Sequence, residues 1–228
     1  MVEQVINKMT MNTRSAALIE SVAQALQWAI SDPSGRTFVN NSLNQKVNSG
    51  NLSGRLSLGE ARQITAVFDS ATVPKTSVYK YLLRLSIAFR CSEASFMAAL
   101  VVLDRLLEHD DGSLRLTMRN VHRAFLASLA VAVKYNEDLV YTNRHYAKAG
   151  GVHLKEVNRL EWALLSALDF DLRVEPEQYR IYETCLLGLG TSGGEEAQKA
   201  LVPLAMTANV TPTPARVVSE RCREHEAV

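Results

Sequence analysis

The chain is poor in cysteine, and its three cysteines, Cys91, Cys185 and Cys222, lie far apart in the sequence. A small disulfide-stabilised domain would carry more cysteines, and a zinc site would need them in close pairs. The first residues also lack the basic start and apolar core of a secretion signal. We therefore expect an intracellular protein, cytoplasmic, nuclear or both, without disulfides or a metal site.

Long apolar runs and alternating patterns are also missing. No apolar run approaches the roughly 18 residues that a membrane-spanning helix needs. No stretch alternates polar and apolar residues for long enough to predict a strand. The 25 basic and 24 acidic residues leave a net charge of +1, which gives no overall attraction to nucleic acid or membranes. We expect an all-α chain with neither as a partner.

The sequence shows no arrangement of residues typical of an enzyme. Its five histidines are scattered, and no nucleophile lies at a recognisable spacing from a base. Gly150 and Gly151 form an isolated pair that is typical of a helix end rather than of a phosphate-binding loop. We predict no catalytic residue, no metal, no cofactor and no small-molecule substrate.

Apolar residues are most concentrated between Thr117 and Tyr135. Every residue from Ala124 to Val133 is apolar except Ser128. A helix without a polar face is buried inside a larger helical protein when it is too short to span a membrane. We therefore predict that this stretch is the central helix of an all-α bundle.

Helical periodicity predicts further helices on both sides of the central one. In the main domain, residues 74–190, they are expected at 77–89, 92–109, 143–149, 154–168 and from Pro176 to an end between Gly188 and Gly190. The N-terminal extension, residues 1–73, is expected to contain a helix at 14–30, a flexible stretch at 31–56 and a short helix at 57–70. We expect the tail, residues 191–228, to be mostly flexible.

Two charged residues, Arg84 and Asp104, lie beside the apolar rows of the first two helices of the main domain. Either both reach solvent, or they pair, because a lone buried charge is costly. We prefer a partly buried structural ion pair between the two helices.

Two other charges, Lys134 and Glu161, allow a different interpretation. Lys134 ends the central helix, and Glu161 lies on a helix face that should be packed. They form either an internal salt bridge that serves only the fold, or two groups at the edge of the bundle that bind the backbone of a second protein. The spacing alone leaves both alternatives open.

An ordered series of motifs resembles the cyclin box, most closely that of the P-type or U-type cyclins, which include the yeast cyclin of phosphate signalling. The motifs are Pro74-Lys-Thr-Ser77-Val, Tyr81-Leu-Leu-Arg84, Phe96-Met-Ala-Ala-Leu100, Leu103-Asp104-Arg105, Asn120-Val-His-Arg123, Ala132-Val-Lys134-Tyr, Tyr141-Thr-Asn-Arg-His-Tyr-Ala-Lys-Ala-Gly-Gly151, Asn158-Arg-Leu-Glu161 and Leu168-Asp-Phe170. The NVHR and YAKAGG stretches are what select the subgroup.

The resemblance implies a five-helix cyclin fold that binds and activates a cyclin-dependent protein kinase without being an enzyme itself. It implies that Lys134 and Glu161 hold the backbone at the start of the kinase's mobile C-helix, and that Asp138 faces an arginine of that helix. It also implies an internal Arg84–Asp104 ion pair. Alternative functions are a cyclin-fold transcription factor, which would need a clearly basic surface, and a helical scaffold without a kinase partner.

Two threonines of the tail, Thr211 and Thr213, are each followed by proline. Such pairs resemble the targets of proline-directed kinases, but they are also common in loose tails that are never modified. Phosphorylation by a bound kinase is a hypothesis that the pattern allows and does not favour.

Overall fold

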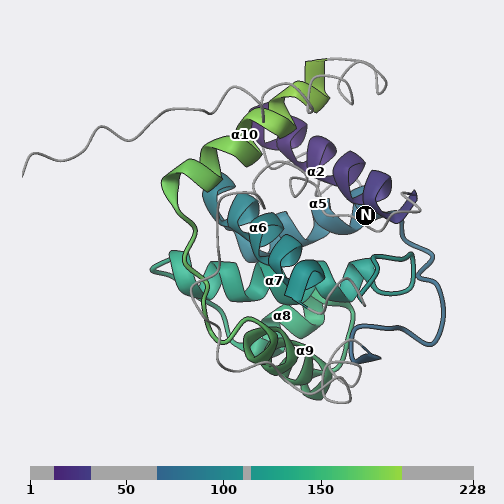
Figure 1. Cartoon of the computed structure of the whole chain (residues 1–228). Coiled ribbons are helices and arrows are strands. Elements are labelled where there is room, and N and C mark those ends of the chain that lie inside the picture. Colours follow the sequence, from purple (N-terminus) through teal and green to yellow (C-terminus); the bar gives the residue numbers. More distant parts are fainter. Residues whose placement is uncertain (1–12, 32–65, 110–113, 192–228) are drawn as a thin grey trace, which may run out of the picture.

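The computed structural model describes residues 13–31, 66–109 and 114–191, and each regular element in these ranges is an α-helix (Figure 1). The helices are α2 (Thr13–Ser31), α5 (Val78–Phe89), α6 (Glu93–His109), α7 (Val121–Asn136), α8 (Asn143–Gly150), α9 (Leu154–Ala167) and α10 (Pro176–Thr191). The all-α fold is therefore confirmed. Three predictions, the flexible stretch at 31–56, most of the short helix at 57–70 and the tail at 191–228, lie outside the described residues.

Helix α7 is the centre of the bundle (Figure 1). All its residues from Ala124 to Val133 are buried. Four helices pack against it, namely α5, α6, α8 and α9. Because other helices pack against α7 on all sides, residues 124–133 have no polar face. The predicted central helix is therefore confirmed.

The central helix begins four residues later than Thr117, where the sequence predicted its start. The side chain of Asn120 accepts the Thr117 N–H at 2.8 Å and donates to the Arg115 carbonyl at 2.9 Å. An asparagine that bonds the backbone in this way offers it an alternative to the helix. Residues 117–120 consequently form a turn, and α7 starts at Val121.

The other helix ends follow from local signals. Ser77 Oγ accepts the Lys80 N–H at the start of α5, and Ser92 Oγ accepts the Ser95 N–H at 3.1 Å at the start of α6. Such serine caps satisfy backbone donors that have no partner inside the helix. At the end of α8, Gly151 has a φ of 71°, a left-handed conformation that favours glycine.

The N-terminal helix expected at 14–30 is α2, and it belongs to the same hydrophobic core as the rest of the bundle. Ile19, Val22 and Leu26 point into that core and are at most 2% exposed. Helix α2 packs mainly against α5 and α10, as Figure 1 shows along the upper side of the molecule. The flanking helices at both ends of the chain thus pack against each other.

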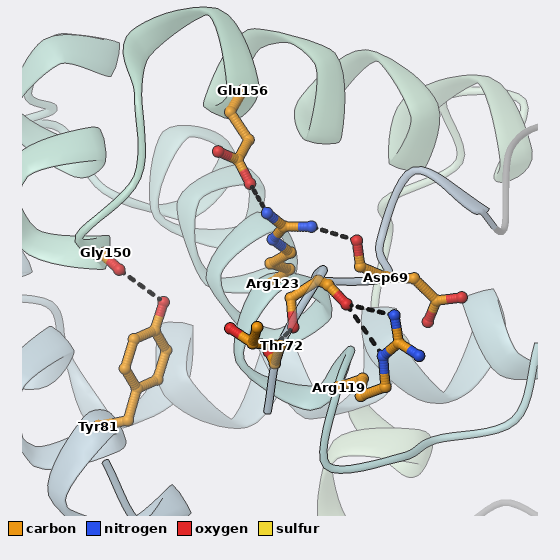
Figure 2. A network of polar contacts seen from close by, with 8 residues as sticks. Asp69, Thr72, Tyr81, Arg119, Arg123, Gly150 and Glu156 are labelled. Carbon is orange, nitrogen blue, oxygen red and sulfur yellow. Dashed lines mark hydrogen bonds and ion pairs between the residues drawn. The ribbon is translucent and has the colours of Figure 1, made fainter. Parts of the chain in front are cut away.

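Two arginines, Arg119 in the turn before α7 and Arg123 in its first turn, bind the segment that leads into α5 (Figure 2). Arg119 donates to the Ser70 carbonyl from Nε at 3.0 Å and from Nη2 at 2.8 Å. Arg123 donates to the Asp69 carbonyl and also forms an ion pair with Glu156 of α9. The N-terminal ends of α7 and α9 are therefore joined through one guanidinium group.

The predicted ion pair between Arg84 and Asp104 is wrong. Arg84 is exposed on α5, where its guanidinium lies 5.0 Å from the Tyr81 ring centroid and donates to the Gly150 carbonyl at 3.3 Å. Asp104 is 1% exposed on α6 and accepts a 2.5 Å hydrogen bond from the Tyr182 hydroxyl of α10. The two side chains diverge because the helix face that carries Arg84 meets α8, whereas the face that carries Asp104 meets α10.

Gly150 is a point of close approach between α8 and α7. A Cβ atom at this position would lie 2.4 Å from Leu126 Cδ2, and Leu126 is fully buried. We expect Gly150→Ala to lower the free energy of unfolding by about 1–2 kcal/mol, because crowding in the core outweighs the small gain in helix propensity. Urea denaturation measures the effect, with the exposed change Lys148→Ala as the control. An unchanged denaturation midpoint would show that Leu126 can move aside.

Candidate partner-binding site

Lys134 lies where α7 leaves the core. The ten residues before it are buried, whereas its own side chain is 29% exposed and the next residue, Tyr135, is 55% exposed. Glu161 lies in the middle of α9, and its side chain is 18% exposed. Both charged groups are therefore at the edge of the bundle, where a second molecule can reach them.

The two groups are bonded to each other. Lys134 Nζ lies 2.5 Å from Glu161 Oε1, and it also lies 5.8 Å from the centroid of the buried Tyr146 ring. The salt bridge of the first alternative is therefore present, and both side chains remain partly exposed, so the second alternative, binding to another protein, stays a prediction. A carboxylate and an ammonium group side by side can accept from and donate to the backbone of another chain.

Asn143, the first residue of α8, completes this cluster. Its Nδ2 donates to Glu161 Oε2 at 2.7 Å and to Asn158 Oδ1 at 2.8 Å. Nothing in the sequence around Asn143 pointed to a role for it at this site, since an asparagine at a helix start is typical of a helix cap. The helical spacing of Asn158 and Glu161, three residues apart on α9, was the available signal that one side chain could contact both.

The loop after α7 is fixed to the start of α6. Glu137 Oε1 accepts the Ser92 N–H at 2.8 Å and the Ser95 hydroxyl at 2.6 Å. Asp138, the next residue, is exposed. Fixing Glu137 therefore places Asp138 on the surface, four residues beyond Lys134.

Glu137 should make the stability of the fold depend on acid pH. The hydrogen bonds from Ser92 and Ser95 hold the pKa of Glu137 below its ordinary value of 4.5. A carboxyl group with a lowered folded-state pKa stabilises the fold above its unfolded-state pKa, and this contribution is lost as the pH falls through the folded-state pKa. We expect Glu137→Gln to flatten the fall of the melting temperature below pH 4.5. Parallel melting profiles for variant and wild type would contradict this.

Large apolar side chains are exposed next to both members of the salt bridge. After Lys134, the exposed residues are Tyr135, Leu139, Val140 and Tyr141, of which Leu139 is 87% exposed. After Glu161, Trp162 is 66% exposed, and its ring lies 6.1 Å from that of Phe170, which is 56% exposed. Exposed aromatic residues around a polar centre are typical of protein interfaces.

The described residues contain neither a group of three or more metal-binding side chains nor a helix that is long and apolar enough to cross a membrane. What the described site offers is one cation, one anion and exposed apolar side chains at positions that follow each of them in the sequence. This combination suits the binding of another polypeptide, since the charges can fix its position while the apolar groups are buried.

Comparisons with known proteins agree with the motifs. A family model described as Cyclin matches residues 2–172, a range that begins before Pro74 and includes α2. Cyclin-U4-1 of Arabidopsis thaliana is 36% identical over 145 residues, which cover 64% of this chain and 70% of that protein. PHO85 cyclin-like protein psl1 of Schizosaccharomyces pombe is 30% identical over 148 residues, which cover 65% of this chain and 61% of that protein. Cyclin-P4-1 of Oryza sativa subsp. japonica is 34% identical over 125 residues, which cover 55% of this chain and 58% of that protein. The chain therefore spans less than two thirds of the length of the last two relatives.

Proposed function

Because the chain belongs to the cyclin family, as its motifs predicted, we propose that it binds and activates a cyclin-dependent protein kinase. In this proposal the chain is a regulatory subunit, and the catalytic residues belong to the kinase. The name of the fission yeast relative links that protein to PHO85, so a kinase of the PHO85 type is the first candidate partner.

The observation that carries the proposal is the partly exposed Lys134–Glu161 pair at the edge of the bundle. In the proposed complex Lys134 donates to a backbone carbonyl at the start of the kinase's C-helix, and Glu161 accepts a backbone N–H there. The aromatic side chains Tyr135 and Trp162, both exposed and adjacent to the pair, supply apolar surface that is buried on binding.

Activation would follow from a shift between two states of the kinase. A kinase whose C-helix is swung out lacks the lysine–glutamate pair that positions ATP. A subunit that binds only the swung-in state pulls the equilibrium toward it. A change from 1:99 to 99:1 requires about 5.5 kcal/mol of differential affinity.

Asp138 is the proposed determinant of specificity at this interface. It is exposed in the loop whose start is fixed by Glu137, four residues beyond Lys134. In the proposal it faces an arginine of the kinase's C-helix, and such a charge pair at an interface selects the partner and speeds association.

Affinity purification of the tagged chain from native extract tests the function. Kinase activity toward a histone or peptide substrate should elute with the chain and should be weak in an eluate of the Glu161→Lys variant. That variant reverses the charge of the group that accepts the backbone N–H. Elution of nucleic acid would favour a cyclin-fold transcription factor, and elution of neither would favour a helical scaffold.

Thr211 and Thr213 lie outside the described residues, and their modification is a subsidiary proposal. If the bound kinase is proline-directed, the two threonine–proline pairs in the tail of this chain are substrates close to it. A phosphopeptide map of the purified complex tests this directly, and a map without phosphate on either threonine would refute it.

A further inference from the structure

The second carboxylate oxygen of Glu161 is held by a group that does not belong to the salt bridge. Lys134 Nζ occupies Oε1 at 2.5 Å, and Asn143 Nδ2 donates to Oε2 at 2.7 Å. The Glu161 carboxylate is therefore bonded to α7 through one oxygen and to α8 through the other. A carboxylate bound through both oxygens is restricted in its rotation about the last side-chain bond.

The orientation of the Asn143 amide is determined by its two acceptors. An ionised carboxylate can only accept hydrogen bonds, so the NH2 group and not the carbonyl must face Glu161. The second proton of Nδ2 goes to Asn158 Oδ1 at 2.8 Å. In this orientation Asn143 Oδ1 is buried without a hydrogen-bond partner among the described residues. The hydrogen bond to Glu161 is thus formed although it leaves the amide oxygen of Asn143 buried without a hydrogen bond, which costs free energy.

Binding of a partner changes the demands on this cluster. In the proposed complex Lys134 and Glu161 each bind the partner's backbone, so the bond between Nζ and Oε1 must open or be shared. If Lys134 were the only group bonded to the Glu161 carboxylate, the carboxylate would lose its orientation as soon as Lys134 turned to the partner, although it must be oriented to accept the partner's backbone N–H. Asn143 sits on α8, which packs against α5, α7 and α9, so its amide stays in place when the lysine moves.

We propose that Asn143 is a positioning residue for partner binding. It keeps the Glu161 carboxylate aimed at the partner's backbone N–H while Lys134 turns from Glu161 to the partner's carbonyl. This proposal rests on the proposed function, and it adds a third side chain that acts through Glu161 and need not touch the partner.

The most informative variant is Asn143→Asp. It keeps the size of the side chain but removes both donor protons and places a second negative charge beside Glu161. A carboxylate at the first position of a helix interacts favourably with the helix dipole, so we expect α8 to stay folded. The matched control is Asn158→Ala, which removes the other acceptor of the Asn143 amide and leaves the bond to Glu161.

The measurement is the dissociation constant for the kinase that is recovered with the wild-type chain, together with the melting temperature of each free variant. We expect Asn143→Asp to weaken binding about tenfold, the usual effect of one hydrogen bond to a charged group, at a melting temperature close to that of the wild type. Asn158→Ala should bind within about twofold of the wild type. Asn143→Ala, which removes the donors without adding charge, should also weaken binding, and it replaces Asn143→Asp if that variant does not fold.

A double-mutant cycle separates a positioning role from a general structural one. Because Asn143 acts through Glu161, the Asn143→Asp change should have no further effect on binding once Glu161→Ala is present. Equal weakening in both backgrounds, or wild-type affinity of the single variants, would overturn the proposal. A wild-type chain that recovers no kinase would refute the proposed function itself, whereas a bound kinase that tolerates both Asn143 variants refutes only the role of Asn143.

Discussion

Lys134→Ala and Glu161→Ala are each expected to weaken kinase binding by about 2–5 kcal/mol while leaving the fold intact. The binding loss is large because each change leaves a backbone group of the partner without its charged hydrogen-bond partner in a desolvated interface. The effect on stability is small because the salt bridge is partly exposed, with 29% and 18% of the two side chains accessible. Ion pairs that solvent reaches typically contribute about 0–1 kcal/mol to folding.

Binding is measured by titration of the kinase and folding by urea denaturation of the same samples. The control is Arg180→Ala, which removes an exposed arginine whose ion pair with Glu177 lies on α10, away from the site. It should change neither quantity appreciably. If Lys134→Ala or Glu161→Ala lowered the denaturation midpoint sharply and bound the kinase normally per folded molecule, the salt bridge would serve only the fold.

Tyr182→Phe is expected to lower the free energy of unfolding by about 2–3 kcal/mol. The Tyr182 hydroxyl donates at 2.5 Å to Asp104, which is 1% exposed. Burial, and to a lesser extent the Asp104 charge, raises the pKa of Tyr182 well above its usual value, so the hydroxyl keeps its proton as a donor. Removal of the hydroxyl would take this hydrogen bond from the buried Asp104 carboxylate, and the loss of a hydrogen bond to a buried charged group is costly.

Arg84→Ala tests whether Tyr182, rather than Arg84, is the partner that stabilises the fold through Asp104. Arg84 is exposed and its hydrogen bond is to the Gly150 carbonyl, so its loss should lower the free energy of unfolding by no more than about 1 kcal/mol. Tyr79→Phe, the same chemical change as Tyr182→Phe on a partly exposed tyrosine of α5, controls for loss of a hydroxyl. If Arg84→Ala lowered the free energy of unfolding by several kcal/mol and Tyr182→Phe did not change it, the result would support an ion pair between Arg84 and Asp104.

Local signals in the sequence predicted the helices well because they depend on short-range physics. The apolar stretch from Ala124 to Val133 could be stable only inside a bundle, and it is the buried part of α7. Ser77 and Ser92 begin α5 and α6, and Gly151 ends α8, through contacts within a few residues. The displaced start of α7 depends on the side chain of Asn120, which favours a turn over a helix.

The candidate site was predicted in part. Lys134 and Glu161 stood out because a charge at the end of an apolar helix, or on a packed helix face, needs a partner. Asn143 did not stand out, because an asparagine that starts a helix has an ordinary local explanation. Its contact with Glu161 spans 18 residues and depends on the way α8 packs against α9.

By itself, the sequence determined the helices, the central place of α7, the motifs that mark the family, and the presence of charges that need partners. These properties depend on residues that are near one another along the chain or on the energy of burying one apolar stretch. Only the tertiary structure decided which charge meets which group, so that Asp104 pairs with Tyr182 rather than Arg84. The physical reason is that helical periodicity shows which face of a helix is buried, whereas the packing of the whole bundle determines which other helix that face meets.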